Sequence, residues 1–240
     1  MEIGEIISDA IMYPINNIKA LAIYLALGII AGIVLVLTGV GPFVIGATSF
    51  DSFGTVGLSG ILGGIIVFVI FLLISGYELD IIKIGILRGE EAPSIDFTRQ
   101  VINGLKLIIV GIIYMIIPII VLVLLAQVNK TLGIIVGIIL LIVFGLALIM
   151  AQCRFADSES LGDALNVPEA INDLRDVGII KVLAILIIIA ILSCVLNFIA
   201  GLFTGLGDVG SFIGSLLSAI FGVYMGFVQY RSYGLLYSDA

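Results

Sequence analysis

The chain contains no histidine and no tryptophan, and only 11% of its 240 residues are charged. Histidine is the commonest metal ligand and the commonest general base near neutral pH, so its absence disfavours a metal site and acid–base catalysis. The two cysteines, Cys153 and Cys194, lie in or beside apolar runs and form no C-x-x-C pair. We interpret them as small apolar residues and expect no disulfide, no metal and no cofactor.

The scarcity of charge also excludes an ordinary soluble protein. Soluble domains carry about a quarter charged residues, whereas 62% of this chain is hydrophobic. Nucleic acid is not an expected partner, because binding it requires a basic face and the chain has a net charge of −7. Much of the chain must instead be solvated by lipid.

Six uncharged stretches are long enough to cross a bilayer as helices, which requires about 20 apolar residues each. The sequence therefore predicts an all-α, polytopic membrane helical bundle that forms a single integral membrane domain over residues 1–240. The six predicted spans are 20–40, 56–77, 107–127, 132–152, 182–203 and 212–230.

The lysines and arginines are distributed unevenly between the two ends of these spans. If there are six spans, one side carries nine cationic residues and the other carries only Lys130. Cytosolic loops are enriched in Lys and Arg, so we expect both termini to be cytosolic and the protein to lie in the cell membrane. The predicted cytosolic segments are 1–19, 78–106 and 154–181, and the predicted outer loops are 41–55, 128–131 and 204–210.

A motif ending in lysine precedes the first, third and fifth spans, at Lys19, Lys106 and Lys181. One interpretation is three repeated units, each an interfacial amphipathic helix followed by a helical hairpin. The alternative is that lysine simply marks the cytosolic end of any inserted hairpin.

No acidic or basic side chain lies inside a predicted span. Proton relays and ion pathways use such residues, so a proton-coupled transporter or a channel for charged solutes is disfavoured. Ser193, Asn197 and Tyr114 are the candidate intramembrane polar contacts, and a carrier of an apolar substrate would bring them together around a cavity. Ser218, Gly222 and Gly226 form the most specific small-residue ladder, which predicts that the last span packs closely on a neighbour.

Short motifs at the cytosolic ends resemble those of the DUF4013 family, prokaryotic multi-pass membrane proteins of unknown function. The likeness covers almost the whole chain, and the following sequence elements carry it: Tyr13-Pro14, Gly76-Tyr77, Gly89-Glu90-Glu91-Ala92-Pro93, Asp96, Gly104-Leu105-Lys106, Arg154-Phe155-Ala156, Ala164 and Gly234.

The resemblance implies a polytopic membrane protein and places its motifs on the cytosolic face. The candidate interaction surface is therefore Gly76, Tyr77, Glu90, Glu91, Pro93, Lys106, Arg154 and Phe155. We expect Gly76 to permit a close helix approach and Tyr77 to lie at headgroup level. We also expect Arg154 to pair with Glu90 or Glu91.

Three kinds of function stay open. The first is a non-enzymatic protein that organises lipids or a cytosolic protein partner as a membrane scaffold. The second is a transporter or flippase-like carrier of an apolar or amphiphilic substrate. The third, a membrane-embedded enzyme, is disfavoured because no H-E-x-x-H, G-x-S-x-G or P-loop motif is present. Membrane lipids are expected partners in each case, and self-association into a homo-oligomer stays open.

Overall fold

The computed structural model describes residues 1–38, 58–204 and 206–239, and this part of the chain is mainly helical, with no strand. Six of the helices are long and apolar enough to cross a membrane. They are α2 (Ile18–Thr38), α4 (Leu58–Ile86), α5 (Phe97–Val128), α6 (Lys130–Ser158), α9 (Ile179–Thr204) and α10 (Gly207–Tyr237). The all-α polytopic fold is confirmed. The predicted outer loop 41–55 and the facing ends of the first two predicted spans lie outside the described residues.

Three shorter helices lie at the end of the molecule where the charges gather. They are α1 (Ile3–Asn16), α7 (Leu161–Ala164) and α8 (Val167–Val177). The amphipathic α1 buries Ile6, Ala10 and Tyr13 and begins with a reciprocal capping box between Glu2 and Glu5. In α8, Asn166 caps the N-terminus and a proline follows within the first turn.

The second predicted repeat unit differs from the other two. Short helices precede α2 and α9, but α5 begins at Phe97 and continues without a break into its membrane span. The separate interfacial helix predicted before the third span is therefore absent from the described residues 58–128. The three hairpins themselves are present, because α2 packs on α4, α5 on α6, and α9 on α10.

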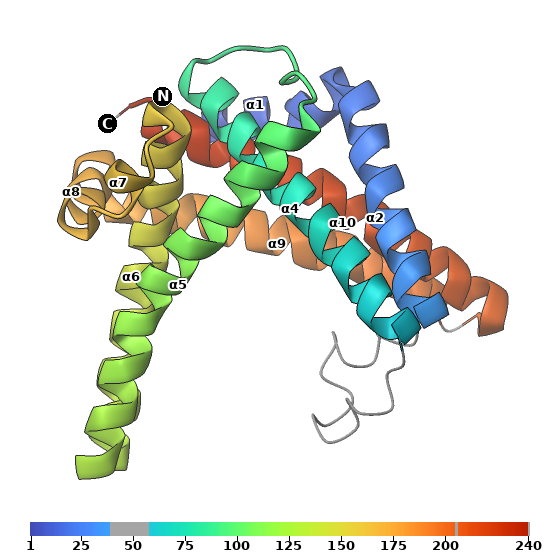
Figure 1. Cartoon of the computed structure of the whole chain (residues 1–240). Helices are drawn as coiled ribbons and strands as arrows, with labels where there is room; N and C mark the ends of the chain where they lie inside the picture. Colours follow the sequence, from blue (N-terminus) through green and yellow to red (C-terminus); the bar gives the residue numbers. More distant parts are fainter. Residues whose placement is uncertain (39–57, 205, 240) are drawn as a thin grey trace.

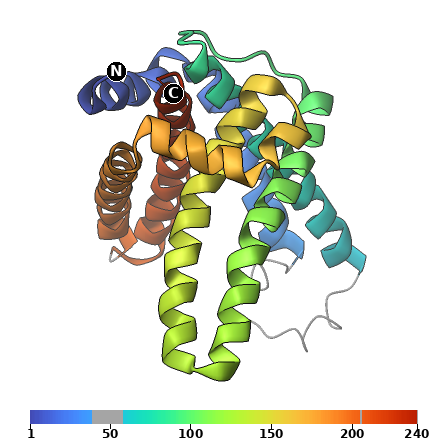
Figure 2. The ribbon, with the colours of Figure 1, turned by 90° about the vertical axis from the view of Figure 1, so that its left-hand side faces the viewer.

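Helices α4 and α10 form the centre of the fold. Helix α10 contacts α1, α2, α4, α6 and α9, and α4 contacts α2, α5, α6 and α10 (Figure 1). The α5–α6 hairpin leaves this centre and stands apart toward its far end (Figures 1 and 2). Its far half is held together internally, because Gly133 lies against Ala126 and Gly137 against Leu122. The helices therefore converge at one end and splay at the other.

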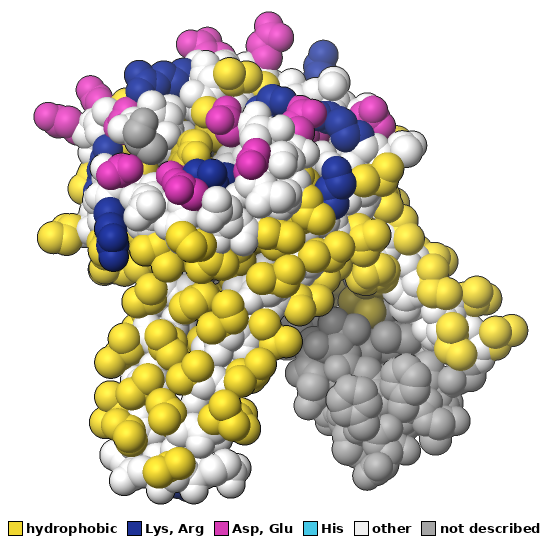
Figure 3. Space-filling model, turned by 60° about the vertical axis from the view of Figure 1, so that its left-hand side comes forward, with side chains coloured by type: hydrophobic (Ala, Val, Ile, Leu, Met, Phe, Trp, Pro, Cys, Tyr) yellow, Lys and Arg dark blue, Asp and Glu magenta, His cyan; other side chains and the backbone are white. Residues whose placement is uncertain are grey.

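Charged side chains occupy the converging end, and hydrophobic side chains cover the α5–α6 hairpin below it (Figure 3). We call the converging end, formed by α1, α7, α8 and the adjoining turns of the long helices, the charged layer. Lys130 is the first residue of α6, at the opposite end of that hairpin. The segregation predicted from the cationic residues is thus present in the fold.

Several helices extend further into the charged layer than predicted. Helix α4 continues past Tyr77 to Ile86, and α5 starts at Phe97 rather than at residue 107. The predicted span 56–77 has no acidic or basic residue, but the longer apolar segment Gly60–Ile86 includes Glu78, Asp80 and Lys83.

Candidate functional site

The packing that positions the site begins with two backbone contacts between α4 and α5. A Cβ on Gly76 would lie 2.0 Å from the Gln100 carbonyl oxygen, and one on Gly104 would lie 2.2 Å from that of Leu72. Only glycine permits this approach. The expectation that Gly76 brings its helix close to a neighbour is confirmed, and the neighbour is α5.

A second close crossing joins α4 to α10. Gly234 lies against the backbone of Ile82 and Gly85, where a Cβ would be 2.2 Å from the Ile82 carbonyl oxygen. The Ser218/Gly222/Gly226 ladder does not make this contact. A Cβ on Gly222 would meet nothing within 4 Å, and one on Gly226 would meet Glu78 Oε1 at 3.5 Å. The ladder therefore leaves room for side chains instead of bringing another backbone close.

Tyr77 lies between α2, α4 and α10 and is fully buried. Its ring stacks on Tyr24 with centroids 3.9 Å apart, and Phe227 packs against both, at 6.0 Å from Tyr24 and 5.7 Å from Tyr77. Its hydroxyl has no hydrogen-bond partner among the described residues. Tyr77 is thus the centre of an aromatic cluster within the protein.

Glu78 lies between two recesses. The first has a volume of 170 Å³, and we call it the aromatic recess; it is lined by Tyr24, Ile74, Tyr77, Glu78, Gly222, Val223 and Phe227. The second has a volume of 180 Å³ and is lined by Phe71, Ser75, Glu78, Leu79, Ile82, Gly104, Leu107, Ile108, Gln152 and Tyr230. The two share only Glu78. The half-buried Glu78 side chain interacts with the Tyr230 hydroxyl, and no ion pair with it occurs in the described ranges.

A polar chain runs beside the aromatic cluster. The Tyr24 hydroxyl donates to Gln100 Oε1 at 3.0 Å, and Gln100 Nε2 donates to Asp80 Oδ2 at 3.3 Å. Arg99 also donates to Asp80 Oδ2, at 2.9 Å. Because buried polar groups are costly unless they are paired, this chain permits Asp80 and Gln100 to be buried where α2, α4 and α5 meet.

Arg231 ties the charged layer to α10. Its side chain is 1% exposed and donates to both carboxylate oxygens of Asp9, at 2.7 and 3.2 Å, and to the Gly89 carbonyl oxygen at 2.7 Å. The guanidinium also lies 4.8 Å from the Tyr13 ring centroid. Burial raises the pKa of Tyr13 to about 12, although Arg231 acts in the opposite direction.

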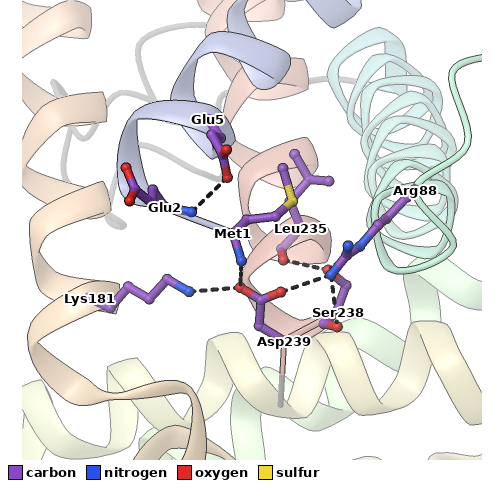
Figure 4. Close-up of polar contacts among 8 residues, drawn as sticks. All are labelled: Met1, Glu2, Glu5, Arg88, Lys181, Leu235, Ser238 and Asp239. Atoms are coloured by element: carbon purple, nitrogen blue, oxygen red, sulfur yellow. Dashed lines mark hydrogen bonds and ion pairs between the residues drawn. The ribbon is translucent and has the colours of Figure 1, made fainter.

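Asp239 joins four parts of the chain (Figure 4). Its carboxylate pairs with the Met1 amino group, with Lys181 at 2.8 Å and with Arg88 at 2.8 Å. Burial opposes ionisation, but the hydrogen bonds from Lys181 and the amino group outweigh it and lower the pKa of Asp239. The start of α1, the end of α4, the start of α9 and the end of α10 are therefore held at one point.

Of the predicted surface residues, Arg154 pairs with a different partner from the one expected. Arg154 Nη1 donates to Asp173 Oδ2 at 2.9 Å, and its Nε donates to the Asp163 carbonyl oxygen. This contact connects α6 to α8. The expected pairing with Glu90 or Glu91 is wrong, because those two residues lie on the connection from α4 to α5 and face α1 through their backbones.

Glu90 and Glu91 are exposed, and Pro93 after them is half-buried. The Glu90 carbonyl oxygen accepts from Asn17 Nδ2 at 2.9 Å, and that of Glu91 accepts from the Tyr13 hydroxyl at 3.4 Å. The connection is therefore fastened to the α1–α2 junction, and both carboxylates remain at the surface.

Two other predicted residues meet across a helix pair. Lys106 lies over the Phe155 ring at 5.6 Å, and Phe155 itself is fully buried. The predicted surface residues consequently separate into buried packing residues (Gly76, Tyr77 and Phe155) and residues nearer the surface.

The predicted intramembrane contacts do not form one site. Asn197 is exposed on α9, and its amide donates to the Ser193 carbonyl oxygen of its own helix at 2.9 Å. Tyr114 is buried in α5 and donates to the Ala164 carbonyl oxygen at 3.0 Å. Neither recess is lined by these three residues. Both cysteines are free; Cys153 is buried and Cys194 is exposed.

The family model described as "Protein of unknown function (DUF4013)" matches residues 64–206, more than half of the chain. The chain belongs to the DUF4013 family. The matched range contains Gly76-Tyr77, Glu90-Glu91, Gly104-Leu105-Lys106 and Arg154-Phe155, but Tyr13-Pro14 and Gly234 lie outside it. Comparison of this DUF4013 protein with curated proteins and with solved structures finds no match.

Sequence reasoning missed Glu78, Asp80 and Gln100 as residues of the buried centre. The signal was present, because Glu78 and Asp80 follow Gly76-Tyr77 directly and Gln100 precedes Gly104 by one helical turn. A charged residue after an apolar run, however, indicates the end of a membrane span and does not by itself predict a buried side chain with partners on other helices. The site that results contains a carboxyl group, stacked aromatic rings and apolar space at the level where the helices begin to splay.

Proposed function

We propose that this DUF4013 protein is a non-enzymatic protein of the cell membrane that organises lipid around splayed helices. The observation that carries the proposal is a contrast within one chain. The charged layer is fastened by ion pairs between distant segments, whereas the far half of the α5–α6 hairpin is packed within the hairpin and stands apart from the other helices (Figure 1).

The ion pairs of the charged layer connect several elements that are distant in sequence. Arg231 with Asp9 joins α10 to α1, Arg99 with Asp80 joins α5 to α4, and Lys83 with Glu159 joins α4 to the end of α6. Single exposed pairs stabilise little, but Asp80, Asp239 and Arg231 are largely buried and belong to networks. A rigid platform follows from this arrangement.

The helices below this layer expose large apolar side chains on most of their circumference. On the α5–α6 hairpin the most exposed include Ile112, Leu124, Val128, Ile135, Ile139 and Ile142. Contiguous apolar surface of this extent must be covered by lipid or by protein. Since the hairpin diverges from the other helices, acyl chains can occupy the space between them.

The orientation of the protein is part of the same proposal. The charged layer carries all the lysines and arginines except Lys130, so the positive-inside rule assigns it to the cytosol. Six of these cations are engaged in ion pairs, which leaves carboxylates such as Glu90, Glu91 and Asp176 exposed. The cytosolic face would therefore suit a partner protein with a basic surface.

Distances between spin labels in lipid nanodiscs test whether the helices stay apart. The labels are placed at Leu124→Cys near the far end of α5 and Ile61→Cys near the far end of α4, with Cys194 replaced by serine. We expect a separation that matches the splayed structure. The control pair, Leu124→Cys with Ile135→Cys, lies within one hairpin and should be short in any arrangement.

A short distance between positions 124 and 61 would mean that the helices close into a compact bundle, and the proposal would fail. The lipid component is measured separately with spin-labelled phosphatidylcholine in the same membranes. We expect more motionally restricted lipid per chain than a closed six-helix bundle holds. If a second copy of the chain covered the exposed apolar helices, less lipid would be restricted and the particle mass would double. This result would also contradict the proposal.

A further inference from the structure

The aromatic recess lies beside the carboxyl group of Glu78, and the rest of its lining carries no charge. Glu78 belongs to the apolar segment Gly60–Ile86, and the ion pairs found in the described chain do not include it. Acidic side chains within a membrane span are costly unless they are neutralised, and they commonly mark a binding site. The Tyr230 hydroxyl interacts with Glu78 but carries no charge, so the carboxylate must be neutralised by a proton or a bound cation.

The lining of the recess favours an organic cation over a metal ion. Calcium and magnesium need several oxygen ligands, but in this recess Glu78 provides the only carboxylate and the rest of the lining is aromatic or apolar apart from tyrosine hydroxyls. Tyr24, Tyr77 and Phe227 instead provide π-electron density. Ammonium groups with methyl substituents bind to such clusters through cation–π attraction, and recognition is strengthened when the site is desolvated.

The size of the recess supports the same class of ligand. A volume of 170 Å³ compares with a cavity of about 150 Å³ that holds a benzene molecule. A trimethylammonium group with one or two methylene groups is of similar size. Gly222 leaves an opening, since a Cβ there would meet nothing within 4 Å, and Gly226 leaves room for the carboxylate at 3.5 Å.

We propose that the aromatic recess binds the ammonium head of a lipophilic organic cation, with Glu78 as counter-ion and the Tyr24, Tyr77 and Phe227 rings in the lining. The apolar tail leaves the recess past Gly222, which is exposed, into the acyl-chain region. The site is independent of lipid organisation by the splayed helices, because it lies within the packed centre between α2, α4 and α10.

Equilibrium dialysis of the purified full chain in a nonionic detergent tests this site. The probes are hexyltrimethylammonium, its uncharged isostere 2,2-dimethyloctane, and hexanesulfonate, which has a similar tail but the opposite charge. We expect saturable binding of the ammonium probe at one site per chain, at least tenfold weaker binding of the isostere, and none of the sulfonate. Equal uptake of all three would show partition into micelles and would overturn the proposal.

Two variants locate the site. Glu78→Gln removes the charge with little change of shape, and we expect at least tenfold weaker binding of the ammonium probe. Gly222→Leu fills the recess while it retains Glu78, so binding should be lost although the fold is kept, as checked by size-exclusion chromatography. The control, Glu91→Gln, changes an exposed carboxylate of the charged layer and should bind as the parent chain does.

If Glu78→Gln fails to fold, Gly222→Leu still decides the question. Unchanged affinity in folded Gly222→Leu would place the probe elsewhere and overturn the assignment. Unchanged affinity in folded Glu78→Gln would show that a proton alone neutralises the carboxyl group and that the recess does not select cations. Neither result would bear on the distances between splayed helices.

Discussion

Gly76 of α4 lies so close to α5 that a Cβ at this position would be 2.0 Å from the carbonyl oxygen of Gln100. This contact sets the depth at which the two helices meet. It also brings the Gln100 side chain to Asp80 and Tyr24, because the same helical turn carries both the backbone contact and the hydrogen bonds. The polar chain at the centre of the protein thus depends on the absence of a Cβ at position 76.

Gly76→Ala should therefore destabilise the protein strongly. The atoms in its way are backbone atoms, which cannot move aside as a flexible side chain can, and overpacking of this kind costs about 1–3 kcal/mol or more. We expect a lower thermal unfolding midpoint and less monodisperse protein in detergent by fluorescence-detected size-exclusion chromatography.

The matched control is Gly64→Ala in the same helix, where a Cβ meets nothing within 4 Å. This variant should be neutral or slightly stabilising, since alanine favours a helix by about 1 kcal/mol relative to glycine. Equal stability of the two variants would contradict the close approach of α4 to α5.

The sequence predicted the six spans because lipid imposes a strong rule on them. Each must run for about 20 residues without charge, and six stretches of this chain do so. The helix ends were predicted less well. Asp80 and Arg99 were interpreted as loop residues, yet they pair with each other at 2.9 Å inside the helical part of the protein. Charge marks the end of an apolar run, but a paired charge does not end a helix.

The binding residues were harder to predict, because they depend on which helix faces which. Asn197 is the only Asn or Gln deep in a predicted span, but its amide is satisfied by its own helix. Glu78, one residue beyond a predicted span, lines both recesses. Sequence position gave the depth of each side chain approximately. The neighbours of a side chain on other helices depend on close backbone contacts, such as that of Gly234 with Ile82. Composition does not specify these contacts.

Arg231 provides a second test of the charged layer. Its buried guanidinium satisfies Asp9 and the Gly89 carbonyl oxygen together, so Arg231→Ala removes three hydrogen bonds and leaves a cavity. Removing one partner of a buried ion pair costs about 3–5 kcal/mol. We expect a loss in this range in unfolding measurements, and a partial loss for Arg231→Lys, which keeps the charge without the planar fork.

The control for Arg231 is Arg175→Ala in α8, an exposed arginine with no ion pair in the described part of the chain. Its stability should be within about 0.5 kcal/mol of the parent. If Arg231→Ala were equally harmless, Arg231 would not be a structural anchor.

The cluster around Asp239 should make stability depend on pH at the acidic end. Folding lowers the pKa of this carboxyl group below its ordinary value of 3.8, so the ionised group stabilises the fold above that value. This contribution is lost as the pH falls through the folded-state pKa. Asp239→Asn should unfold at a lower temperature than the parent at pH 7, and the difference should shrink toward pH 3.

The comparison variant for this measurement is Asp176→Asn, which changes an exposed carboxylate of α8 that makes no ion pair among the described residues. It should follow the parent at every pH. A gap between Asp239→Asn and the parent that stays constant from pH 7 to pH 3 would show that Asp239 acts through packing and not through its charge.

Cysteine labelling of intact cells tests the proposed orientation. Lys130 is at the far end of the α5–α6 hairpin, whereas Lys106 and Lys181 lie in the charged layer on helices α5 and α9. If cationic residues are retained in the cytosol, a membrane-impermeant maleimide should label Lys130→Cys from outside. Lys106→Cys and Lys181→Cys should react only after the membrane is permeabilised, with Cys194 replaced by serine throughout. Labelling of all three from the same side would contradict the six-span topology. The acidic surface around Glu90 and Glu91 would then lose its assignment as a cytosolic docking face, whereas the aromatic recess would keep its chemistry in either orientation.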